Sequence, residues 1–231
     1  MVEPSSEDRG NFLNVPWVDT VRFIRQLSHD LRNHLNAIEL QSAYITEFES
    51  NEELKVEIKR LREMISRLTS TVQKLSGGLG EIKPNPIFYR ASDFVEDLRK
   101  KIAQEFPNNS ADITWKIEAG DAVLNIAPEL LQEAFIELFA NAFRHDRGEG
   151  ALVAKVTADK NQFIFTLHEP KERFELSTVN WGREPLRHIS HGHYGLGLNR
   201  VRIIIEAHGG EMRAQYDAKS ARLATTLTLP A

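Results

Sequence analysis

A seven-residue apolar repeat in the first third of the chain is the strongest constraint on its fold. Four residues of its first part recur at every seventh position: Ile24, Leu31, Ile38 and Ile45. In its second part the spacing alternates between four and three residues, through Leu54, Ile58, Leu61, Ile65, Leu68, Val72 and Leu75. Such spacing forms one apolar stripe on an α-helix that packs lengthwise against other helices. The sequence therefore predicts two long helices with continuous packing seams.

A very short connection between these helices predicts an antiparallel hairpin. We expect the first helix to begin at residues 16–19 and to end near Glu49. Residues 50–53 have the form of a capping box that starts the second helix, and Gly77 and Gly78 end it. One partner helix does not cover both stripes, so we expect the hairpin of residues 17–79 to form a homodimeric four-helix bundle. Docking of the stripe onto the C-terminal half of the same chain is the alternative.

His29 lies opposite the seam of the first helix, whereas His34 lies within it. We therefore expect His29 to face water and His34 to face a packing partner. Asp30 follows His29 directly, and Asn33 lies one turn further along on the same side. A carboxylate beside a histidine holds one ring nitrogen as N–H and leaves the other as a nucleophile. The simpler interpretation is an exposed histidine without a function.

Composition excludes several classes of chemistry. The chain has 231 residues and no cysteine, which excludes disulfides, thiolate metal sites and cysteine nucleophiles. A net charge of −4 gives no overall attraction to nucleic acid or to an anionic membrane surface. No apolar run reaches the length of a membrane span, and residues 1–16 form a polar, flexible N-terminus rather than a signal peptide. We therefore predict a soluble, cytoplasmic protein without a membrane or nucleic-acid partner.

A linker at residues 80–90, containing Pro84 and Pro86, separates the hairpin from a second domain at residues 91–231. Ser92 caps the first helix of this domain, which runs to about Phe106. The other expected elements are strands at 113–117, 122–125, 152–158 and 162–168, helices at 129–144 and about 195–207, and a closing hairpin of strands at 211–216 and 222–229.

Polar residues follow one another at steps of four on the otherwise apolar helix of residues 129–144. They are Glu133, Glu137, Asn141 and His145. Four polar groups stacked on one face predict a helix that lines a polar pocket, and a solvated face is the alternative.

A long polar segment, residues 169–194, precedes the last helix. Segments of this length between ordered elements are usually functional or mobile. Its histidines, at positions 188, 191 and 193, are weak candidates for a metal site because no paired carboxylates lie near them. Gly195 and Gly197 open the helix that follows, where backbone N–H groups can approach an anion.

Three of these motifs together resemble the catalytic core of two-component histidine kinases. Residues 28–33 (Ser-His-Asp-Leu-Arg-Asn) resemble the H box of that family, residues 137–145 its N box, and residues 195–198 its glycine box. Their order and spacing also match, over roughly residues 17–230. The resemblance implies an α+β fold, in which a dimeric helical hairpin precedes an α/β sandwich of the ATPase-kinase type.

On the hairpin, the resemblance implies that His29 accepts a phosphoryl group and that Asp30 orients and activates its ring. Asn33 matches the position that can place water for dephosphorylating a partner regulator. That partner is the receiver domain of a response regulator, which carries the phosphoryl group on an aspartate.

In the sandwich, the resemblance implies a site for ATP and Mg²⁺. Asn141 is the expected Mg²⁺ ligand, Glu137 takes the preceding position of the N box, and Arg144 and His145 contact phosphates. Gly195 and Gly197 complete the phosphate side. Metal and cationic groups of this kind neutralise the charge that develops during phosphoryl transfer.

The adenine side departs from the family pattern. The family ends a strand with Asp-x-Gly-x-Gly, whose aspartate reads the adenine amino group and whose glycines let the base approach. Here residues 168–173 contain no glycine, and strand alternation puts Glu169 at the position of the aspartate. Glutamate reaches one methylene further, and Pro170 and the residues after it obstruct the approach.

Three functional hypotheses remain open from the sequence. The protein is a histidine phosphotransferase that no longer uses ATP, an autophosphorylating histidine kinase with a nonstandard adenine pocket, or a regulator-docking protein whose His29 is never phosphorylated. Too few residues precede His29 for an input domain, so we expect any signal to arrive through another protein.

Overall fold

The computed structural model describes residues 16–79, 82–144, 148–159, 161–175, 177–183, 185 and 195–231. The chain divides into two compact units, Met1–Gly80 and Glu81–Ala231. Within the described ranges, no helix combines the length and the apolar content that crossing a bilayer demands.

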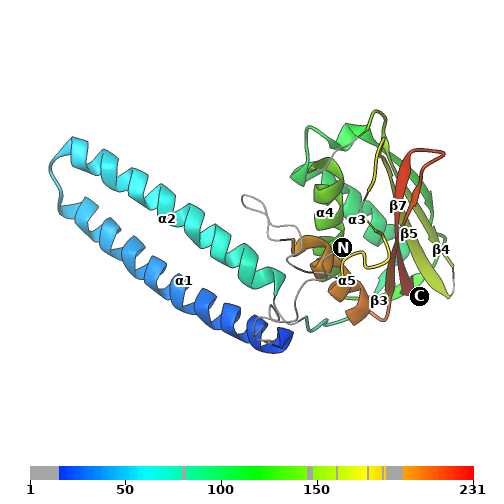
Figure 1. Ribbon diagram of the computed structural model, residues 1–231, viewed down its shortest axis with the longest axis horizontal. Helices are drawn as coiled ribbons and strands as arrows, with labels where there is room; N and C mark the ends of the chain where they lie inside the picture. Colours follow the sequence, from blue (N-terminus) through cyan, green and yellow to red (C-terminus); the bar gives the residue numbers. More distant parts are fainter. Residues whose placement is uncertain are drawn as a thin grey trace, which may run out of the picture. The chain divides into compact units, whose positions relative to one another are not determined.

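The first unit is the predicted antiparallel hairpin of two long helices (Figure 1), α1 (Trp17–Phe48) and α2 (Glu52–Gly78). The predicted capping box is wrong in one detail, because Asn51 rather than Ser50 is the N-cap. The Asn51 side chain accepts hydrogen bonds from the backbone N–H groups of Glu53 (2.9 Å) and Leu54 (3.3 Å). The Glu49 side chain accepts the N–H of Asn51 itself at 2.7 Å, so the reciprocal contact comes from two residues before the cap rather than from the first turn of α2.

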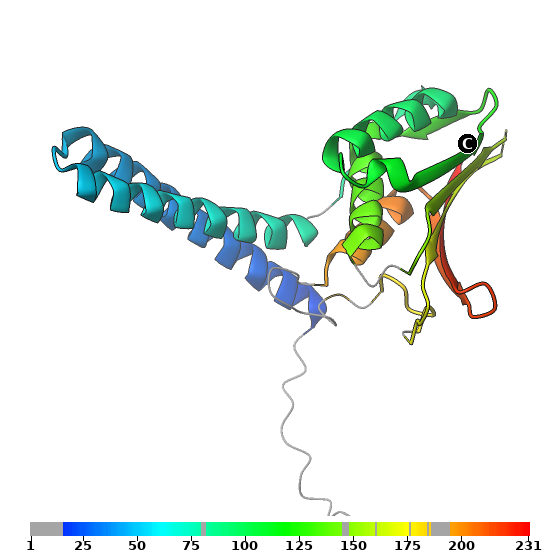
Figure 2. The same ribbon diagram turned by 90° about the horizontal axis from the view of Figure 1, so that it is seen from above.

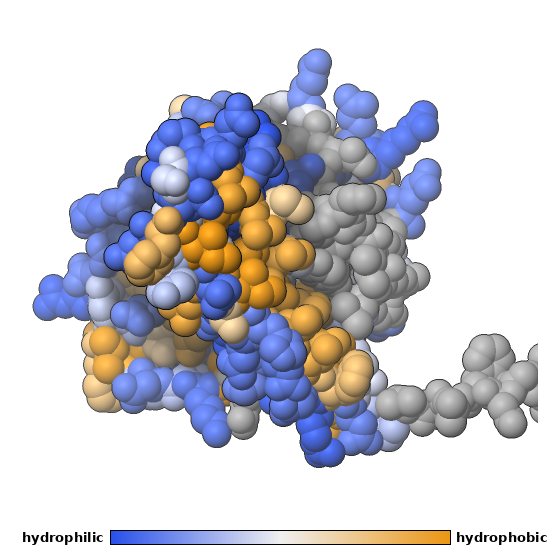
Figure 3. Space-filling model, turned by 90° about the vertical axis from the view of Figure 1, so that its left-hand side faces the viewer, coloured by the Kyte–Doolittle hydropathy of each residue, from blue (hydrophilic) through white to orange (hydrophobic). Residues whose placement is uncertain are grey.

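The helices of the hairpin pack through a face that is rotated from the predicted seam of α1. Side chains buried between the helices come from both: Ser28, Leu35, Ser42, Ile58 and Ile65. Seven other apolar residues on or beside the predicted seams are between 41% and 54% exposed: Leu27, Leu31, Ile38, Ile45, Leu54, Leu61 and Leu68. His34 is exposed among them in the single chain. The hairpin therefore has a second apolar face, and Figure 3 shows hydrophobic residues gathered on this side of the molecule.

The second unit is built on a five-stranded sheet in the order β2-β4-β5-β7-β6. The strands are β2 (Ile113–Glu118), β4 (Leu152–Ala158), β5 (Gln162–Pro170), β6 (Glu211–Asp217) and β7 (Arg222–Pro230). Only β2 and β4 pair in parallel, and the other neighbours are antiparallel. Three helices, α3 (Ala91–Glu105), α4 (Pro128–Arg144) and α5 (Gly197–Ala207), cover one face of this sheet (Figure 2).

A separate two-stranded sheet changes two expectations at the start of this unit. β1 (Ile87–Arg90) pairs antiparallel with β3 (Val123–Ile126), so residues 87–90 belong to the second unit rather than to a linker. Ser92 does not cap α3, because its hydroxyl bonds the Asp93 carboxylate and Arg90 occupies the N-cap position. β1 and β3 are distant in the sequence, and pairing between distant segments leaves no pattern in either segment that would predict it.

Aromatic rings fill the space between the helices and the sheet. Phe135 of α4 packs edge-on against Phe165 of β5, with 4.7 Å between the ring centroids. Alternation along β5 buries Phe163, Phe165, Leu167 and Glu169 on the helix side. The strand continues past the predicted end at His168, because Glu169 and Pro170 pair with Leu223 and Arg222 of β7. The core thus fixes the last inward position of β5, and a carboxylate occupies it.

Candidate functional site

The H-box side chains come together on the surface of α1. The imidazole of His29 is 64% exposed, and its Nδ1 lies 3.2 Å from Oδ1 of Asp30. The same nitrogen lies 3.4 Å from Nδ2 of Asn33. The sequence predicted this exposure and this grouping. Because both contacts involve Nδ1, Nε2 is left available for reaction.

Hydrogen bonding to Asp30 determines which ring nitrogen of His29 keeps a lone pair. The bond from His29, and next the 2.9 Å bond from Nε2 of Gln26, hold the pKa of Asp30 below its usual value. An ionised Asp30 accepts the Nδ1–H of His29 and leaves a lone pair on Nε2. In that tautomer the Asn33 amide presents its oxygen to Nδ1–H or withdraws, since two N–H groups do not bond each other.

Sequence reasoning missed two residues that hold this site. Gln26 lies four residues before Asp30, a helical spacing that was a usable signal. Arg25 donates from Nε to the backbone carbonyl of Leu79 at 3.0 Å and donates to it from Nη2 as well. This bond ties α1, one turn before His29, to the end of α2. It crosses between segments far apart in sequence, so no local pattern indicated it.

The predicted polar face of α4 meets α5. Oε1 of Glu133 accepts a hydrogen bond from Nε of Arg200 at 3.0 Å. Glu137 packs against the start of α5 so closely that a Cβ built on Gly197 would lie 2.0 Å from its Oε1. Nδ2 of Asn141 is buried and has no hydrogen-bond partner among the described residues. Two of the four predicted polar groups therefore contact α5, and Asn141 retains an unused donor.

The other residues of the predicted phosphate side lie at the end of α4 and at the start of α5. Arg144 is exposed at the end of α4. His145 and the histidines at 188, 191 and 193 lie outside the described residues. Gly195 has a φ of +62°, a conformation that favours glycine, and Gly197 is the first residue of α5. The glycine box therefore has two local causes, a left-handed turn and close packing against Glu137.

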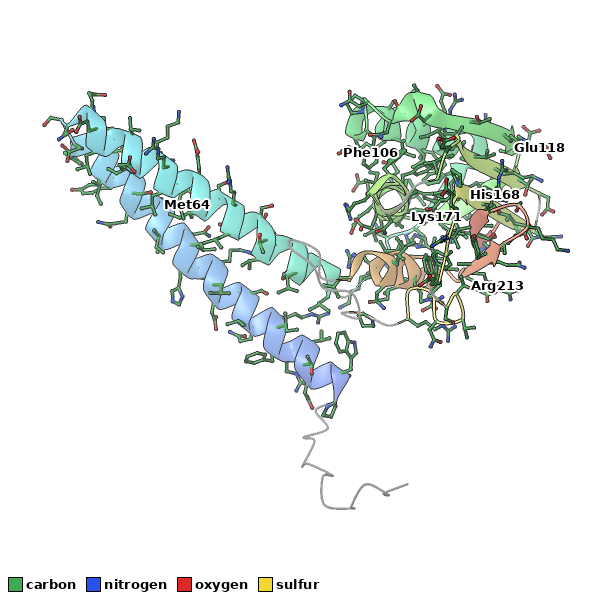
Figure 4. The ribbon with its side chains drawn as sticks, turned by 45° about the horizontal axis from the view of Figure 1, so that its top comes forward. Met64, Phe106, Glu118, His168, Lys171 and Arg213 are labelled. Carbon is green, nitrogen blue, oxygen red and sulfur yellow. The ribbon has the colours of Figure 1, made fainter. Side chains whose placement is uncertain are left out.

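Glu169 occupies the inward position that strand alternation predicted, and its neighbour in the core is Lys171. Each residue is only 5% exposed, and Nζ of Lys171 lies 3.6 Å from Oε2 of Glu169. Burial raises the pKa of Glu169 to about 7, although Lys171 acts in the opposite direction. Figure 4 shows Lys171 inside the second unit, on the side of the sheet that carries the helices.

Only the phosphate side of the expected ATP site has a residue that fits the nucleotide. On the phosphate side, the unused N–H of Asn141 suits an anion, but the described residues contain no cluster of three carboxylates or histidines for a metal. On the base side, the only inward carboxylate at the end of the described β5 is paired with a buried lysine. The Glu169–Lys171 pair, at the place that would receive the base, does not fit it.

No protein-family model matches the sequence, and no curated protein matches it. Solved structures do match. Full-length ShkA in complex with AMPPNP has a TM-score of 0.63 at 18% identity, over 90% of this chain and 45% of that chain. The histidine kinase AdeS of Acinetobacter baumannii has a TM-score of 0.52 at 18% identity, over 87% of this chain and 97% of that one.

This chain has the fold of a histidine-kinase catalytic core. The catalytic domain of the histidine kinase ThkA, in a nucleotide-free form, agrees with this, with a TM-score of 0.50 at 13% identity. That match covers 63% of this chain and 95% of the ThkA domain. The chain spans less than half the length of ShkA. The helical hairpin and the α/β sandwich of the sequence analysis are thereby confirmed as a fold.

Proposed function

We propose that this protein carries a phosphoryl group on His29 and exchanges it with the aspartate of a response-regulator receiver domain. The observation that carries the proposal is the exposed imidazole of His29, whose Nδ1 is 3.2 Å from a carboxylate with a lowered pKa. This arrangement supplies a neutral nucleophile at Nε2 on a rigid helix. It is the chemistry that phosphoryl exchange between proteins requires.

The exchange balances with the groups present in the two proteins. The lone pair on Nε2 attacks the phosphorus of an aspartyl phosphate, a P–N bond forms, and the P–O bond to the receiver carboxylate breaks. The positive charge that develops on the ring is stabilised by Asp30, which keeps the proton on Nδ1. The return transfer follows the same path in reverse. Asn33, one turn from His29, is our candidate for placing the water that hydrolyses the receiver phosphate.

We propose that the protein acts as a homodimer. The exposed leucines and isoleucines of the hairpin form an apolar stripe on both helices, and a symmetric second copy buries such a stripe in a four-helix bundle. A second copy packed on the stripe would also cover His34, which is exposed in the single chain.

A histidine phosphotransferase is the form of this activity that the second unit supports. The Glu169–Lys171 pair argues against a functional adenine site. An ATP-dependent histidine kinase is the alternative, and the unused donor of buried Asn141 favours it. A docking protein without phosphorylation gives no reason for the Asp30 contact with His29.

Substitution of His29 tests the proposal directly. Receiver domains from the source organism would be charged with acetyl phosphate and mixed with the wild-type chain, with His29→Gln and with His34→Gln. Transfer to the wild type and to His34→Gln, and none to His29→Gln, supports the proposal. Equal transfer to all three proteins would refute it, because the control removes a histidine from the same helix.

A further inference from the structure

We infer that Lys171 occupies, within this chain, the place where a nucleotide base would bind, so that the α/β unit is complete without a nucleotide. The inference deepens the proposed function by naming the source of the phosphoryl group. If the unit takes no ATP, the group reaches His29 from an aspartyl phosphate on a receiver, and the protein acts between two receivers.

The carboxylate of Glu169 lies inside the second unit and has a partner there. Glu169 ends a run of inward residues on β5, so its oxygens lie in the helix–sheet interface rather than in solvent. A buried carboxylate without a donor is strongly unfavourable. The ammonium of Lys171, 3.6 Å away and equally buried, fills that requirement. An acceptor that could read an exocyclic amino group is therefore already paired with a group of its own chain.

Hydrogen bonds to its backbone N–H and carbonyl hold Lys171 in place. Its N–H donates to the carbonyl of Ala221 at 2.8 Å, and its carbonyl accepts the hydroxyl of Tyr216 at 3.1 Å. Just before it, Pro170 accepts the N–H of Gly148. Contacts on both sides of the strand prevent the lysine from turning outward without breaking them. Its four-carbon stem then fills volume that a glycine would leave open.

Hydrogen bonds and a ring contact within the chain hold the described residues after Lys171 to the rest of the second unit. Arg202 of α5, 6% exposed, donates to the carbonyl of Trp181 at 2.9 Å and to that of Met212 at 3.1 Å. Asn199 donates to the carbonyl of Gly182 at 2.9 Å. The ring of Trp181 packs on that of Phe174, with 5.5 Å between the centroids. These contacts within the chain hold the described part of the segment to α5 and β6.

Calorimetric titration of the full chain with MgATP and with AMPPNP tests the inference. We expect no binding heat from the wild type up to about 1 mM nucleotide, whereas micromolar binding would overturn the inference. Lys171→Gly should tighten nucleotide binding at least about tenfold, and Lys171→Met, which keeps the bulk of the side chain, should not. Equal affinity in the glycine and methionine variants would show that Lys171 is not the obstruction.

A second measurement on the wild type does not depend on how well the variants fold. Hydrogen exchange of the backbone amides of residues 169–183 should be the same with and without AMPPNP. Protection by the nucleotide would overturn the inference. Transfer from a phosphorylated receiver to His29 is read separately, so a chain that binds ATP yet accepts the group on His29 refutes only this inference.

Discussion

Nδ1 of His29 lies 3.2 Å from Oδ1 of Asp30, and Gln26 holds the same carboxylate oxygen at 2.9 Å. The carboxylate is thus fixed between a ring nitrogen and an amide one turn earlier on α1. This relationship assigns the proton to Nδ1 and the reactive lone pair to Nε2. The phosphoryl chemistry proposed for the chain depends on it.

Replacing Asp30 with asparagine should slow phosphoryl transfer to His29 by about a hundredfold, because a neutral amide does not stabilise the charge that develops on the ring. Single-turnover transfer from a charged receiver measures the rate. Asp19→Asn is the matched control, since Asp19 is a carboxylate of the same helix that pairs with Arg22 instead. An unchanged rate in Asp30→Asn would remove Asp30 from the mechanism.

Leu61→Asp should convert the proposed dimer into a folded monomer. Leu61 is 46% exposed in the single chain, so the substitution leaves the buried face of the hairpin intact and charges only the outer stripe. Sedimentation equilibrium gives the mass, and helical circular dichroism reports the fold. Lys59→Asp places an aspartate at an exposed polar position and changes the net charge by two units instead of one, yet it should stay dimeric. A dimeric Leu61→Asp protein would contradict the proposed bundle.

The pKa of Glu169, about 7 in the folded chain against an ordinary 4.5, sets a pH dependence of stability. Between these two values the folded state binds more protons than the unfolded state. The free energy of unfolding therefore falls by about 3 kcal/mol in total as the pH rises through this window. Above the window it is level.

Urea unfolding of the wild type and of Glu169→Gln over this pH range measures the effect. The difference between the two proteins isolates Glu169, because the other carboxyls titrate alike in both. A difference that stays constant with pH would show that the folded state does not retain the proton on Glu169.

Gly197→Ala should destabilise the second unit by about 1–2 kcal/mol, because the new Cβ meets the carboxylate of Glu137 and displaces it. In a Glu137→Ala background the same change should cost close to nothing. Thermal or urea unfolding of the four proteins completes a double-mutant cycle. If Gly197→Ala lowered the stability equally in both backgrounds, Glu137 would not be the reason that this position requires glycine.

Local patterns predicted a large part of this fold. Periodicity located α1, α2 and α4, and strand alternation put Glu169 on the same face of its strand as Phe163, Phe165 and Leu167. These predictions succeed because side-chain spacing follows directly from backbone geometry.

Features that depend on distant contacts were not predictable in the same way. The hairpin buries Ser28 and Ser42, whose small polar side chains carry no hydrophobic signal, while the leucines of the stripe remain outside. Lys171 is buried because Glu169, Ala221 and Tyr216 meet there, and β1 forms because β3 lies beside it. No stretch of sequence records such a meeting of separate segments.

The most direct test of the central claim is to identify the ring nitrogen that carries the phosphoryl group. The ¹⁵N-labelled protein would be phosphorylated by a charged receiver and studied by nitrogen–phosphorus correlation NMR. We expect a single phosphohistidine, at His29, with phosphorus bonded to Nε2 and the proton on Nδ1. Phosphorus on Nδ1, on another histidine or on no histidine would contradict it.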